Sequence, residues 1–149
     1  GFLLHLRSLS LSTMNQKSSV TQLTQFVPWL MTLDISTIGC GPFDGGCVVV
    51  AEALQMALGG QVVVLIRSND LADHAAVLIN GLLVDYDGPL PPEAFIKRFS
   101  ENERPVFRIT GYRTMRARDL PNAPRDKVLA RHLSTHLHNT GISALDGVG

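Results

Sequence analysis

A cysteine at the expected start of a buried helix is the most reactive group that the sequence offers. Cys47 follows two glycines and begins the segment 47–58, which is apolar almost throughout and ends at a Gly-Gly pair. The positive end of the helix dipole and the unpaired amides of the first turn favour a thiolate over a thiol. We therefore expect Cys47 to be nucleophilic.

A histidine and two aspartates lie on a predicted β-hairpin further along the chain. The pair Asn80-Gly81 is typical of a type I′ turn between two strands. Counting back from this turn places Ala76 opposite Asp85 and His74 opposite Asp87. The imidazole and both carboxylates are therefore expected on one face of the hairpin.

These residue types together indicate acyl transfer. An imidazole beside Cys47 favours the thiolate, and a carboxylate orients the imidazole through its second nitrogen. The backbone amide of Cys47 would help to bind the oxyanion that forms on the attacked carbonyl. The chain thus contains candidates for a nucleophile, a base and an orienting acid.

The composition and hydropathy pattern of the whole chain predict the helices and strands that must position these groups. The chain has 149 residues, 45% of them hydrophobic, and 13 basic and 13 acidic side chains, which fits one cored domain. No apolar run is long enough for a membrane helix, and two cysteines cannot form a disulfide scaffold. Helices are expected within 20–33, where Pro28 interrupts the pattern, and at 92–99 and 127–138; strands are expected at 61–66, 75–79, 82–86 and 106–112.

We divide the chain into three parts. Residues 1–13 contain one arginine and no acid, which indicates translated upstream sequence, a cloning remnant or a presequence, and fits a secretory signal poorly. Residues 14–140 form the single domain, and residues 141–149 form a flexible tail.

Two stretches resemble the papain-like cysteine hydrolase superfamily, namely GGCVVVAEAL at 45–54 and DHAAVLINGLLVDYDG at 73–88. The likeness covers about residues 39–88 and is greatest to small bacterial peptidases and amidases and to transglutaminase-like enzymes. It implies an α+β fold in which the helix starting at the cysteine is buried against an antiparallel sheet. It also implies that Cys47 is the nucleophile and His74 the base, and it favours Asp85 over Asp87 as the third member.

The sequence departs from this family in its oxyanion hole. Many papain-like enzymes carry a glutamine several residues before the nucleophile, whereas residues 40–44 of this chain are Cys-Gly-Pro-Phe-Asp. The second donor could be a backbone amide of the glycine-rich loop, such as that of Gly46, or the side chain of Gln22 or Gln25. Cys40 is expected to be a buried or loop thiol, because no helix start is evident there.

Two other features compete with the hydrolase interpretation. The segment 104–131 has eight basic residues and two acidic ones, so a non-catalytic papain-like module could use it to bind an acidic protein, and less readily nucleic acid. His132 and His136 have metal-ligand spacing on a helix, but neither a neighbouring cysteine nor the metalloprotease glutamate accompanies them.

The sequence therefore predicts a hydrolase that cleaves an amide bond through a thioester. Its substrate would be a protein or peptide, and the reaction could be that of a peptidase, an amidase or a glutamine deamidase. We expect no cofactor, no metal and no membrane, and the oligomeric state is open.

Overall fold

The computed structural model describes residues 45–103 and 108–138. The helix predicted within 20–33, the terminal segments 1–13 and 141–149, and Cys40 lie outside the described residues. The described elements are α3 (Cys47–Leu58), β1 (Gln61–Arg67), β2 (Ala72–Ile79), β3 (Leu82–Asp85), β4 (Gly88–Leu90), α4 (Pro92–Asn102), β5 (Ile109–Thr114) and α5 (Lys127–Leu137).

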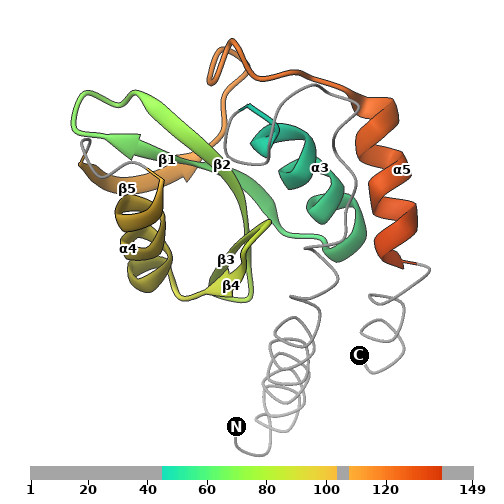
Figure 1. The fold of residues 1–149 in the computed structure, drawn as a ribbon, viewed down its shortest axis with the longest axis horizontal. Coiled ribbons are helices and arrows are strands. Elements are labelled where there is room, and N and C mark those ends of the chain that lie inside the picture. The colour runs from blue at the N-terminus through green and yellow to red at the C-terminus, as the bar shows by residue number, and fades with distance from the viewer. Residues whose placement is uncertain (1–44, 104–107, 139–149) are drawn as a thin grey trace, which may run out of the picture.

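The five strands form one antiparallel sheet in the order β4-β3-β2-β1-β5. Helices α3 and α5 pack together on one side of this sheet, and α4 lies against the other side (Figure 1). The predicted α+β class, with the helix that starts at Cys47 buried on an antiparallel sheet, is therefore confirmed.

Both faces of the sheet are buried, which explains why its central strands are almost continuously apolar. Alternate residues of a strand point to opposite faces, so Val64 and Val77 pack in the cluster of α3 and α5. Val63 and Ala76 pack in the second cluster, which includes Phe95 and Phe99 of α4. Hydrophobic burial on two sides thus holds the strands that carry the candidate site residues.

Helix α3 has the bounds that the sequence predicts. It is apolar around nearly its whole circumference because the sheet covers one side and α5 another. Gly59 follows it with φ 86°, and its amide donates to the carbonyl of Gln55. A left-handed glycine of this kind ends a helix without the steric penalty of a Cβ.

The hairpin between β2 and β3 has the predicted turn and register. Asn80 and Gly81 both have positive φ values, 52° and 78°, as a type I′ turn requires. Ile79 lies opposite Leu82, and the pairing continues to Val77 opposite Val84. The Asn-Gly pair therefore sets the relative positions of these two strands.

The sequence pattern predicts no strand between the hairpin and the helix that starts at Pro92, but the structure has one. Strand β3 stops at Asp85 instead of residue 86, and Gly88–Leu90 returns as β4, with Gly88 opposite Asp85. Pro89 is tolerated because β4 is an edge strand, where a missing N–H need not break a ladder bond. Other bounds differ by one to three residues: α4 extends to Asn102, β5 runs from Ile109 to Thr114, β2 begins at Ala72, β1 ends at Arg67 and α5 ends at Leu137.

None of the helices in the described residues is long and apolar enough to span a membrane.

We expect Gly60→Ala to destabilise the protein more than Gly81→Ala. Both glycines have positive φ, 84° and 78°, where an L-residue costs about 1–2 kcal/mol. A Cβ on Gly60 would in addition lie 2.5 Å from the carbonyl oxygen of Leu78, whereas a Cβ on Gly81 meets nothing within 4 Å. Urea unfolding of the two variants measures the difference. Equal losses would show that the close approach of Gly60 to β2 is unimportant.

Candidate active site

Cys47 is the first residue of α3, as predicted. Gly46 precedes the helix, no side chain caps it, and its first turn contains no acidic residue. The unpaired amides of this turn therefore have no carboxylate to neutralise them within the helix. Cys47 is 6% exposed, so a thiolate there would depend on its protein neighbours for stabilisation.

A β-bulge interrupts β2 directly before His74. Leu65 of β1 pairs with His74, but the next residue of β1 pairs with Ala72, so Asp73 is an extra residue in β2. Ala72 packs on the α3 side of the sheet, whereas the imidazole of His74 stacks on Phe99 of α4. The bulge therefore places Ala72 on the α3 side, while His74 lies on the α4 side, where its alternation with Ala76 puts it.

An ion pair fixes the bulge. Arg67 donates from Nε and Nη2 to the two carboxylate oxygens of Asp73, both at 2.7 Å. The Asp73 side chain is only 8% exposed, and such bidentate geometry restrains both partners. The residue directly before His74 is thus held from β1.

Cys47 and His74 interact directly, although they belong to different elements. Burial alone would raise the pKa of the Cys47 thiol, but the hydrogen bond and the positive charge of His74 lower it, and the backbone amides of Ala75 and Cys47 donate to the sulfur. The pKa of Cys47 therefore lies below its ordinary value of 9.0. This is the direction required of a cysteine nucleophile.

His74 also contacts Asp85, the acid that the family resemblance favours. Its Nε2 lies 2.7 Å from Oδ2 of Asp85, and the two residues are 1% and 4% exposed. Burial would lower the pKa of His74, but hydrogen bonds to Asp85 and Cys47 and their negative charges raise it to about 9. Since Nε2 faces Asp85, the other ring nitrogen is the one that remains for Cys47.

Asp87 does not lie where the register count predicted. The chain turns after Asp85, and β4 begins at Gly88, so no strand position opposite His74 is available to Asp87. Its backbone amide instead donates to Oδ1 of Asp85 at 2.8 Å. Burial and the nearby carboxylate of Asp85 raise the pKa of Asp87. The structure therefore brings Asp85, and not Asp87, to the imidazole.

Helix α4 supplies three contacts that sequence reasoning missed. The ring of Phe99 stacks on His74 with centroids 4.6 Å apart, and Phe95 lies further off at 6.5 Å. Arg98 donates to Oδ1 of Asp85 at 3.2 Å. The i, i+3, i+4 spacing of these residues shows only that they share a helix face; the strands that this face covers are determined by the tertiary fold.

The expected oxyanion donors are described only in part. The amide of Cys47 is directed at its own sulfur, and the buried Gly46 uses its carbonyl to accept from Val50. Gln22 and Gln25 lie outside the described residues. The second donor therefore stays a prediction.

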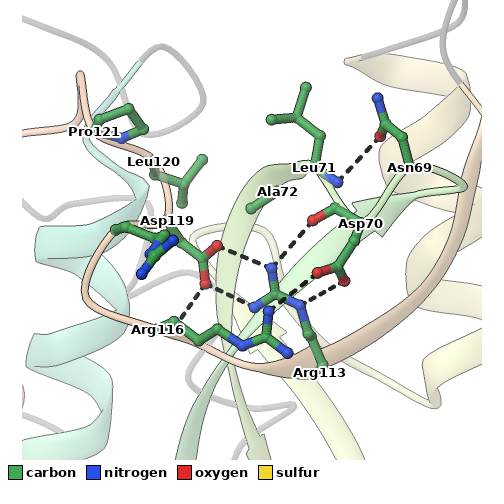
Figure 2. Close-up of a pocket in the computed structure, with 10 residues that line it drawn as sticks. Asn69, Asp70, Leu71, Ala72, Arg113, Arg116, Asp119, Leu120 and Pro121 are labelled. Carbon is green, nitrogen blue, oxygen red and sulfur yellow. Dashed lines mark hydrogen bonds and ion pairs between the residues drawn. The ribbon is translucent and has the colours of Figure 1, made fainter.

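The basic segment is largely engaged in internal contacts where it is described. Figure 2 shows the guanidinium of Arg113 between Asp119 and Asp70, and the same pocket, of about 380 Å³, contains Arg116 bonded to Asp70. Asp119 holds Arg113 through both oxygens and also accepts the backbone amide of Arg116. These arginines join the β1–β2 turn to the segment after β5.

Other basic side chains of this segment also have partners. Arg125 donates to several backbone carbonyls, among them that of Ala123 at 2.8 Å, and Lys127 pairs with Glu52 of α3. Arg118 and Arg131 are exposed. The local excess of positive charge is therefore smaller at the surface than the sequence indicates.

His132 and His136 are exposed on α5. In the described part of the chain, no three histidines, cysteines or acids are grouped as metal ligands would be.

Comparisons of the chain with protein-family models, with curated proteins and with solved structures find no match.

We expect Asp85→Asn to raise the pKa of Cys47 and Asp87→Asn to leave it nearly unchanged. An amide in place of the Asp85 carboxylate removes the charge that keeps His74 protonated, and a neutral His74 stabilises the thiolate less. The rate of Cys47 alkylation against pH, resolved from Cys40 by mass spectrometry, measures both variants. If Asp87→Asn gave the larger change, Asp87 would be the group that controls His74.

Proposed function

We propose that this protein is a papain-like cysteine hydrolase that cleaves amide bonds. The observation that carries the proposal is the buried chain of contacts from Cys47 through His74 to Asp85, together with the lowered pKa of the thiol and the raised pKa of the imidazole. A thiolate beside an imidazolium is both a nucleophile and a proton donor.

In the first half of the proposed reaction, the Cys47 thiolate attacks the carbonyl carbon of the amide. A C–S bond forms, and negative charge develops on the carbonyl oxygen, where backbone amides at the start of α3 would stabilise it. His74 then gives its proton to the leaving nitrogen as the C–N bond breaks. The products of this half are a free amine and a thioester on Cys47.

In the second half, water replaces the amine. Once Cys47 is acylated, the thiolate no longer contributes to the raised pKa of His74, so the imidazole can accept a proton from water. The water oxygen bonds to the carbonyl carbon, the C–S bond breaks, and Cys47 leaves as a thiolate. The net reaction converts an amide and water into a carboxylic acid and an amine.

Throughout both halves, Asp85 holds one nitrogen of His74. Its carboxylate fixes the ring orientation and stabilises the imidazolium, as the acid of a catalytic triad does. The proposed substrate is a peptide bond, another amide such as a cell-wall amide, or a glutamine side chain.

The competing proposal, a non-catalytic module that binds through segment 104–131, has less support. Arg113 and Arg116 are already paired with acidic side chains, and Arg113 is largely buried. Reversing the charge of Arg113 would break an internal network and could not test binding. Exposed Arg118 and Arg131 are the suitable positions for that test.

We expect p-nitrophenyl acetate to acetylate Cys47, and Cys47→Ala to abolish this modification. The ester has a good leaving group, so the experiment needs the nucleophile but no natural substrate. Intact and peptide mass spectrometry show the added acetyl group and its position. Acetylation of Cys40 at the same rate as Cys47 would contradict the proposed role of the helix.

The reaction with amides should be lost as the pH rises through about 9, whereas acetylation by the aryl ester should persist. His74 has its pKa raised to about 9, so its proton is present below that pH and absent above it. An amine leaving group needs this proton, and p-nitrophenolate does not. Rate profiles for an anilide and for the aryl ester test the difference. A parallel decline of both would exclude His74 as the proton donor.

A further inference from the structure

The two oxygens of the Asp85 carboxylate have different partners. Oδ2 faces His74, while Oδ1 accepts the backbone amide of Asp87 at 2.8 Å and Nη2 of Arg98 at 3.2 Å. Rotation of the carboxylate would break the bonds on both sides. Whatever holds Oδ1 therefore also determines where Oδ2 lies.

Arg98 is one of the two donors to Oδ1, and it also restrains the other. In addition to its direct bond, its Nη1 donates to the carbonyl of Asp87 at 3.2 Å and its Nη2 to that of Gly88 at 2.8 Å. These bonds fix the turn between β3 and β4, from which the second donor comes. Loss of Arg98 would remove one donor to Asp85 and release the turn residue whose amide supplies the other.

An aromatic ring also holds the guanidinium of Arg98 in place. It lies over the ring of Phe95, 5.1 Å from the centroid, and its side chain is 23% exposed. On the same helix, Phe99 stacks on His74. One face of α4 thus contacts the imidazole through a phenyl ring and the orienting carboxylate through a guanidinium.

We propose that Arg98 is a positioning residue that fixes the Asp85 carboxylate so that Oδ2 stays directed at Nε2 of His74. The proposal rests on the proposed hydrolase function, since it assigns Arg98 a role in holding the same triad.

Orientation outweighs the direct charge effect of Arg98 on the imidazole. The guanidinium donates directly to Asp85, and its partial exposure weakens its field at the ring. Asp85, in contrast, bonds directly to His74 and helps to raise the pKa of the imidazole. A misplaced Asp85 would lower that pKa, whereas mere removal of a nearby positive charge would raise it.

The test compares Arg98→Met with Lys97→Met, which makes the same change of charge and side chain on the exposed side of α4. In Arg98→Met, we expect the pKa of His74, measured by imidazole ¹⁵N NMR titration, to fall toward 6.5. Acetylation of Cys47 by p-nitrophenyl acetate at neutral pH should slow about tenfold. Lys97→Met should match the wild type in both measurements.

Arg98→Lys keeps the experiment decisive if Arg98→Met fails to fold. A lysine retains the charge but cannot reach three acceptors with a planar fork, so we expect an intermediate fall of the His74 pKa. An unchanged or raised pKa in the folded Arg98 variants would overturn the proposal, even if they were less stable. Failure of the wild type to be acetylated would count against the hydrolase alone, because the titration reports the position of Asp85 without any reaction.

Discussion

A buried imidazole held between a thiol and a carboxylate is the constraint on which the rest of this structure depends. His74 is almost fully buried, and a charge in such a place is costly unless its neighbours compensate it. Cys47 and Asp85 provide that compensation, because their hydrogen bonds and negative charges raise the pKa of the imidazole, Asp85 through Nε2. Since each of the three comes from a different element, α3, β2 and β3 must meet for any of them to be stable in its charged form.

Residues from these elements meet at His74 because helices cover both faces of the sheet. Helix α3 brings Cys47 from one side, while α4 packs Phe99 against His74 and directs Arg98 at Asp85 from the other. The alternation of side chains along β2 directs Ala75 to the α3 side and His74 to the α4 side, so neighbouring residues of one strand contact both layers. The apolar core and the charged site are therefore built from the same strands.

Much of this arrangement could be predicted from local patterns. The Asn80-Gly81 turn set the hairpin register, and the apolar run ending in glycines gave the bounds of α3. Strand β4 was missed because a proline-containing segment reads as a sheet terminator unless its place at the edge is known. The contacts of α4 with the site were missed because the sequence of a helix shows which of its residues are apolar and does not show which strands they will cover.

The sequence by itself determined the candidates Cys47 and His74 and the pair Asp85 and Asp87, because helix starts, tight turns and strand alternation are set by neighbouring residues. Only the tertiary structure decided between Asp85 and Asp87 as the partner of His74. That choice depends on the return of the chain as β4 directly after Asp85 and on the approach of Arg98 from α4, and strand alternation within the hairpin predicts neither. The same holds for the basic segment, in which Lys127 pairs with Glu52 of α3 while Arg113 and Arg116 pair with Asp70 of the β1–β2 turn.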